Sequence, residues 1–125
     1  MKFSHLVQIN DPHNPLIQSL SREQLWRGLV LRAEDPAQFV LALDSVRILQ
    51  RGDKLLLREL QFGDSRIRDT VSFEPMVEVR YDSEASDGAP AARLVMRIEE
   101  PDSGQIFVRF DYETQAHHEP PGKDL

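Results

Sequence analysis

The chain has 125 residues, a formal net charge of −6 and no cysteine. A chain of this length is expected to form one domain, because folding can bury roughly two thirds of the surface that the unfolded chain exposes. Its 40% hydrophobic content argues against a disordered protein, and its negative charge gives a nucleic-acid partner no electrostatic footprint. The absence of cysteine excludes a disulfide framework and thiol chemistry. The N-terminus lacks a signal-peptide pattern and no stretch of about 20 apolar residues could span a bilayer, so a cytoplasmic protein is expected.

Alternating apolar residues predict a half-buried strand at the start of the chain, with Phe3, His5, Val7 and Ile9 on its inner face. An Asn-Pro pair then predicts a short helix over residues 15–20, because asparagine is a good N-cap and proline suits the first helical position. A strand followed by helices is therefore expected at this end of the chain.

A second helix is predicted to begin at a capping box formed by residues 21–24. Its apolar stripe includes Trp26, which is expected mainly to pack the helix on a sheet, although its indole N–H could also reach a ligand. Pro36 ends this helix. Residues 39–43 are too irregular to assign and are expected to be a buried connector into a strand over residues 45–50.

Turn residues divide the chain after residue 45 into six further strands. The first two of the predicted turns lie at residues 52–53 and 63–64. Gly63 followed by Asp64 suits a two-residue type II′ hairpin. Counting outward from that hairpin pairs Leu60 with Ile67, Leu56 with Val71 and Arg58 with Asp69. An arginine and an aspartate are thus predicted side by side on the apolar face.

The parity of apolar residues predicts the other strand connections. A three-residue loop at 74–76 would set Val71 opposite Val79 and Asp69 opposite Tyr81. The loop at 101–104 would set three inner residues opposite three others: Leu94 with Phe110, Met96 with Val108, and Ile98 with Ile106. Only the turn near Gly52 conflicts with parity, and we predict a three-residue loop there, with Gly52 in the left-handed conformation and a bulge.

These elements form a curved, seven-stranded antiparallel sheet with two short helices between its first two strands, an α+β arrangement with one wet face. The strings NDPHNP, SREQLWRGLVLRAEDP, RELQFGDSRIRD and RIEEPDSGQIFVRFDYE resemble those of the AtaL-like family of unknown function. That family is placed in the SRPBCC helix-grip superfamily with START lipid-transfer domains, polyketide cyclases and plant pathogenesis-related allergens. The resemblance implies a sheet wrapped around a long C-terminal helix, with a ligand cavity between them.

The end of the chain departs from the helix-grip pattern. After a domain over residues 1–114, the tail 115–125 is polar and proline-rich, with no amphipathic helix to cover the sheet. We expect either that the C-terminal helix is missing from this sequence or that a partner subunit covers an open apolar face, since soluble monomers rarely expose a large one. His117 and His118 lie on this tail. Adjacent histidines rarely point at one ion, so no metal is expected, and no cofactor motif appears.

The candidate site is the inner face of the sheet. Arg58, Asp69 and Tyr81 should lie together there, and a desolvated Arg–carboxylate pair could either orient a ligand or only order the sheet. His5 also points inward, although a lone inward histidine is more often a satisfied core residue. The predicted ligand-binding residues are His5, Trp26, Arg58, Leu60, Asp69, Tyr81, Met96 and Phe110.

Three functions stay open on the sequence alone. The first is binding of a small hydrophobic or aromatic ligand in an internal cavity. The second is a polyketide cyclase- or aromatase-like enzyme, in which Arg58 and Tyr81 polarise a carbonyl and His5 or Asp69 moves a proton. The third is a module that forms a homodimer through the open sheet. No sequence feature separates binding from catalysis.

Overall fold

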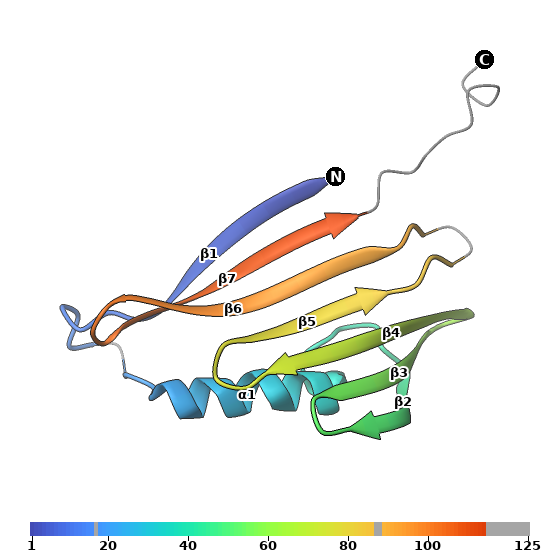
Figure 1. Cartoon of the computed structure of the whole chain (residues 1–125), viewed down its shortest axis with the longest axis horizontal. Helices are drawn as coiled ribbons and strands as arrows, with labels where there is room; N and C mark the ends of the chain where they lie inside the picture. Colours follow the sequence, from blue (N-terminus) through green and yellow to red (C-terminus); the bar gives the residue numbers. More distant parts are fainter. Residues whose placement is uncertain (17, 87–88, 115–125) are drawn as a thin grey trace, which may run out of the picture.

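The structure is a computed structural model that describes residues 1–16, 18–86 and 89–114. A seven-stranded antiparallel sheet with the order β1-β7-β6-β5-β4-β3-β2 forms one layer, and a helix lies along it (Figure 1). The elements in chain order are β1 (Lys2–Asn10), α1 (Arg22–Glu34), η1 (Pro36–Gln38), β2 (Ser45–Gly52), β3 (Leu55–Phe62), β4 (Ser65–Glu74), β5 (Glu78–Ser83), β6 (Ala92–Asp102) and β7 (Gln105–Thr114). The predicted curved sheet is confirmed, with α1 and the 3-10 helix η1 between its first two strands.

Helix α1 begins at the predicted capping box. The backbone N–H of Gln24 donates to the Ser21 hydroxyl at 3.0 Å, and the Ser21 N–H donates to the Gln24 side chain at 2.8 Å. Leu25, Leu29 and Ala33 form the buried stripe of this helix, as the spacing predicts. The helix therefore presents its apolar face to the sheet from the first turn to the last.

The short helix predicted over residues 15–20 does not form in the part of this segment that the structure describes, which leaves out residue 17. The Asn14 side chain does accept a backbone hydrogen bond, but from the N–H of Leu16 at 3.0 Å, which closes a local turn. The buried Asn10 amide then bonds both backbone groups of Leu20, at 2.6 and 2.9 Å. These bonds hold Leu20 beside the end of β1, and the helical pattern starts only at α1.

The connector between η1 and β2 is not the buried segment that its apolar residues suggest. Phe39 is 44% exposed and Leu41 93% exposed, while Val40 is half-buried. The connector leads to β2, which is an edge strand with no further strand beyond it, so the sheet offers nothing to cover those side chains.

The β3–β4 hairpin matches the sequence prediction in full. Leu60 lies opposite Ile67, Arg58 opposite Asp69, and Leu56 opposite Val71. Gly63 adopts a φ of +58°, which the first central position of a type II′ turn requires and which glycine adopts without steric cost.

Two other hairpins keep the predicted faces but are displaced by two residues. Val71 lies opposite Tyr81 rather than Val79, and Asp69 lies opposite Ser83 rather than Tyr81. Leu94, Met96 and Ile98 pair with Tyr112, Phe110 and Val108. A shift of two residues leaves every side chain on its own face, so the alternation of apolar residues could not distinguish the two registers.

The displaced connections have local causes. In the β4–β5 connection Met76 takes a left-handed φ of +67° and its carbonyl accepts the Arg22 Nε–H at 3.0 Å, which ties the loop to the start of α1. In the β6–β7 hairpin the ladder is irregular between Glu99 and Asp102. Pro101 lies in that interval and has no N–H to donate to the ladder.

The bulge predicted at Gly52 lies elsewhere. Gly52 pairs with Leu55 across a two-residue turn, and the register shifts between Ile48 and Gln50 instead. The predicted position of the bulge was wrong. A bulge in this hairpin is nevertheless present, and at Leu49 it keeps Ile48 opposite Arg58 on the inner face.

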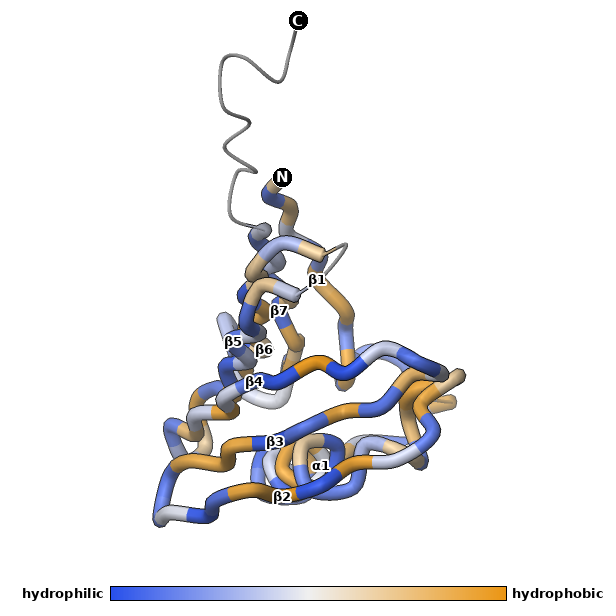
Figure 2. Tube along the Cα trace, turned by 90° about the vertical axis from the view of Figure 1, so that its right-hand side faces the viewer, coloured by the Kyte–Doolittle hydropathy of each residue, from blue (hydrophilic) through white to orange (hydrophobic). Residues whose placement is uncertain are grey.

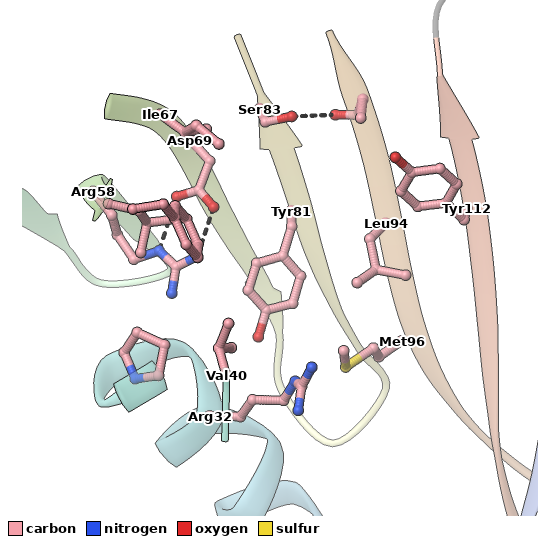
Figure 3. Close-up of a pocket in the computed structure, with 14 residues that line it drawn as sticks. Arg32, Val40, Arg58, Ile67, Asp69, Tyr81, Ser83, Leu94, Met96 and Tyr112 are labelled. Carbon is pink, nitrogen blue, oxygen red and sulfur yellow. Dashed lines mark hydrogen bonds and ion pairs between the residues drawn. The ribbon is translucent and has the colours of Figure 1, made fainter. Parts of the chain in front are cut away.

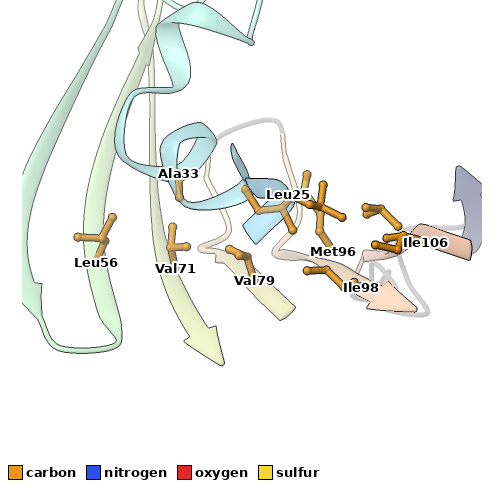
Figure 4. Close-up of a cluster of buried hydrophobic side chains, with 10 residues drawn as sticks. Leu25, Ala33, Leu56, Val71, Val79, Met96, Ile98 and Ile106 are labelled. Atoms are coloured by element: carbon orange, nitrogen blue, oxygen red, sulfur yellow. The ribbon is translucent and has the colours of Figure 1, made fainter. Parts of the chain in front are cut away.

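The core lies between α1 and the concave face of the sheet (Figures 2 and 4). Val71 and Val79 at its centre are fully buried. The buried cluster comprises Leu25, Leu29, Ala33, Leu56, Val71, Val79, Met96, Ile98, Ile106 and Val108. On the outer face, charged side chains pair between strands, as Arg68 does with Glu59 at 3.2 Å.

Candidate functional site

A cavity of about 370 Å³ lies between the last turn of α1 and the inner face of the sheet. Figure 3 shows its polar side chains facing one another across this space. Most of the lining is apolar, which is the usual composition of a small-molecule pocket. The lining residues are Arg32, Pro36, Val40, Arg58, Leu60, Phe62, Ile67, Asp69, Tyr81, Ser83, Ala92, Leu94, Met96 and Tyr112.

Arg58 and Asp69 form a closed ion pair on one wall of the cavity. Arg58 Nε and Nη2 donate to the two carboxylate oxygens of Asp69 at 2.8 and 2.6 Å, a bidentate geometry. Arg58 Nη1 donates to the backbone carbonyl of Ala33 at 2.8 Å. That carbonyl belongs to the last turn of α1, where carbonyls lack helical partners and a positive charge is favourable. The pair therefore joins the helix end to the sheet.

Tyr81 lies beside this ion pair. Unlike the charged groups of the pair, its hydroxyl makes no hydrogen bond within the described residues. Its ring centre is 5.2 Å from the Arg58 guanidinium carbon, within the range of a cation–π contact. The Tyr81 hydroxyl is buried and has no hydrogen-bond partner among the described residues. Burial raises the pKa of Tyr81 above its ordinary value, while the positive charges of Arg58 and Arg32 oppose that rise. Tyr81 therefore lines the cavity as a neutral phenol, and its hydroxyl is a buried donor without a partner among the described residues.

Arg32 reaches the cavity from the last turn of α1, and sequence reasoning missed it. It follows Leu29 by three residues and Leu25 by seven, so helical spacing places it on the buried face of α1. That spacing was the available signal. No hydrogen bond or ion pair of Arg32 occurs within the residues that the structure describes.

The structure brings together five of the eight predicted ligand-binding residues. Arg58, Leu60, Asp69, Tyr81 and Met96 line the cavity, and the two-residue shift in register moves Tyr81 to a diagonal position from Asp69 without taking it off their common face. The remaining three predicted residues lie elsewhere.

His5, Trp26 and Phe110 do not line the cavity. His5 is exposed on the edge strand β1, where it pairs with Phe110 of β7. Trp26 packs edge-on against Phe73 at 6.4 Å between ring centres. The strand order explains why the prediction for His5 was wrong. Three strands separate β1 from β4, so a side chain on the inner face of β1 lies far from the Arg58–Asp69 pair.

Neither a metal site nor a membrane-spanning helix occurs in the part of the chain that the structure describes. Within residues 1–16, 18–86 and 89–114, no cluster of three or more His, Asp or Glu side chains could hold a metal ion. No helix in this part is long and apolar enough to cross a membrane. His117, His118 and the rest of the predicted tail, where the family pattern would place a long helix, lie outside the described residues.

Comparisons with known proteins agree with this architecture. The profile of a family described as AtaL, "Acetylaranotin biosynthesis cluster protein L", matches residues 7–124. The Zhui aromatase/cyclase from Streptomyces sp. R1128 has a similar structure, with a TM-score of 0.63, 15% identity, and coverage of 93% of this chain and 69% of that one. Ara h 8.0201 is similar too, with a TM-score of 0.62, 14% identity, and coverage of 98% and 82%. No curated protein matches.

Proposed function

The chain belongs to the AtaL family, and we propose that it binds a small hydrophobic or aromatic molecule in the cavity under α1. The observation that carries the proposal is a cavity of about 370 Å³ with a mostly apolar lining and a few polar groups. A space of this size falls within the range of small-molecule pockets. The fold likeness to an aromatase/cyclase supports a ligand with aromatic or polyketide-like character.

The Arg58–Asp69 pair has a structural part in this proposal. Both carboxylate oxygens and three guanidinium nitrogens already have partners within the protein. Such a pair is costly to disturb, because a ligand that displaced one partner would leave the other charge buried. The pair therefore shapes the wall, and the other polar groups of the lining, Tyr81 among them, are left to meet a ligand.

A cyclase mechanism with His5 or Asp69 as the proton carrier gains no support from this geometry. His5 is exposed on β1 and does not line the cavity, and Asp69 is engaged by Arg58. General acid–base catalysis needs the proton carrier within hydrogen-bond reach of the reacting atom.

Homodimerisation stays a prediction. Phe3 is 51% exposed on β1 and is one apolar side chain of the sheet that a partner subunit could cover.

A thermal-shift and calorimetric screen with aromatic and lipid-like compounds tests the binding function. A ligand at 100 times its Kd should stabilise the protein by about 2.7 kcal/mol. Ala92→Phe places a large side chain in the cavity and should abolish binding of the hits, whereas Ala91→Phe, at a neighbouring position that does not line it, should leave binding intact. The proposal fails if no compound shifts the melting temperature, or if Ala92→Phe leaves affinity unchanged.

A further inference from the structure

We propose that the cavity selects ligands that carry an anionic oxygen group, such as a carboxylate or an acidic enol, on an apolar body, and that Arg32 and Tyr81 bind that group. This inference rests on the proposed binding function and specifies the ligand class for it. Two side chains from different elements, α1 and β5, supply the binding groups.

The charge of the cavity wall comes from three side chains, Arg32, Arg58 and Asp69. Because Arg58 and Asp69 neutralise one another in a bidentate pair, the lining carries one net positive charge, that of Arg32. Figure 3 shows the Arg32 side chain extending from α1 toward the space beside the Tyr81 hydroxyl. An anion in this space would meet a guanidinium whose own neighbours have not already neutralised it.

The Tyr81 hydroxyl supplies the second binding group. A buried donor without a partner is unfavourable, because it has lost its hydrogen bonds to water and gained none in the protein. A ligand oxygen that entered between Tyr81 and Arg32, displacing the side chains that cover the buried hydroxyl, would accept from both. Hydrogen bonds to a charged oxygen are the stronger kind. The same buried environment keeps Tyr81 protonated, and so a donor, at neutral pH.

Arg32 also lies in the last turn of α1, where a positive charge favours the helix dipole without any ligand. That structural effect does not distinguish an anionic ligand from a neutral one of the same shape. The two explanations therefore differ in one measurable quantity, the selectivity between matched ligands.

Calorimetry with 2-naphthoate and 2-naphthamide, which differ in charge but hardly in shape, provides the test. The wild-type protein should bind 2-naphthoate about tenfold more tightly than 2-naphthamide. Arg32→Met and Tyr81→Phe should each weaken naphthoate binding at least about fivefold and leave naphthamide binding within about twofold. Arg27→Met, on an exposed part of the same helix away from the cavity, should change neither affinity.

The outcomes separate this inference from the binding function itself. Equal affinities for the acid and the amide, or a selectivity that survives both Arg32→Met and Tyr81→Phe, would overturn the anion site while leaving a neutral-ligand pocket in place. Failure of both naphthalenes to bind, together with an empty compound screen, would overturn both. Unfolding of each variant in urea identifies any that has lost its fold, and Tyr81→Phe, which removes only a hydroxyl without a partner, is the variant least prone to do so.

Discussion

Removal of one member of the Arg58–Asp69 pair should destabilise the protein more than removal of both. The two residues are each 4% exposed, so either one left alone would be an uncompensated buried charge. Breaking a buried pair in this way costs about 3–5 kcal/mol. We therefore expect that loss for Arg58→Met and again for Asp69→Leu, out of the roughly 5–15 kcal/mol that stabilises a typical domain.

The double variant Arg58→Met/Asp69→Leu leaves no buried charge at this position. What remains is the Ala33 carbonyl, which loses the 2.8 Å hydrogen bond from Arg58, and an unsatisfied buried acceptor costs about 1–3 kcal/mol. The double variant should thus lose about 1–3 kcal/mol, several kcal/mol less than the two single losses together. This non-additivity measures the coupling of the pair.

Urea unfolding followed by tryptophan fluorescence provides the assay, because Trp26 is the one tryptophan and packs on Phe73 in the core. The neighbouring pair of the same hairpin, Glu59 and Arg68, is a matched control. Its arginine side chain is 59% exposed, so a cycle of Glu59→Leu and Arg68→Met should show a coupling of about 1 kcal/mol or less. Additive losses at Arg58 and Asp69 would refute the account of the closed pair.

Two other predictions follow from local features of the structure. Because the folded protein holds the Tyr81 proton more tightly than the unfolded chain, wild-type stability should fall as pH rises above about 10. Tyr81→Phe should lack this part of the alkaline loss of stability. An identical alkaline loss in both proteins would contradict the prediction. Ser21→Ala removes the capping box and should lower the free energy of unfolding in urea by about 1 kcal/mol. Ser65→Ala, at an exposed position of β4, should lower it little. Equal losses of stability in the two variants would argue against the cap.

The sequence by itself determined the features that depend on nearest neighbours. The Gly63 turn, the pairing of Arg58 with Asp69, and the start of α1 at Ser21 were all predictable, because turn chemistry and capping involve residues within a few positions of one another. Alternation also assigned the inner-face residues of β3 to β7 to the correct side. The period of a strand is two, and a local pattern of that period is enough to choose between two faces.

Only the tertiary structure decided which inner-face residues share a site. Registers that differ by two residues are equivalent in alternation, so the sequence could not place Ser83 rather than Tyr81 opposite Asp69. The sequence could not exclude His5 from the cavity, because its distance from the cavity depends on the strand order. It could not place Arg32 in the cavity, because that depends on where α1 ends against the sheet. Contacts between distant segments also decide which polar groups have hydrogen-bond partners. Arg58 donates to the Ala33 carbonyl only after α1 has docked on the sheet, whereas the Tyr81 hydroxyl has no partner among the described residues.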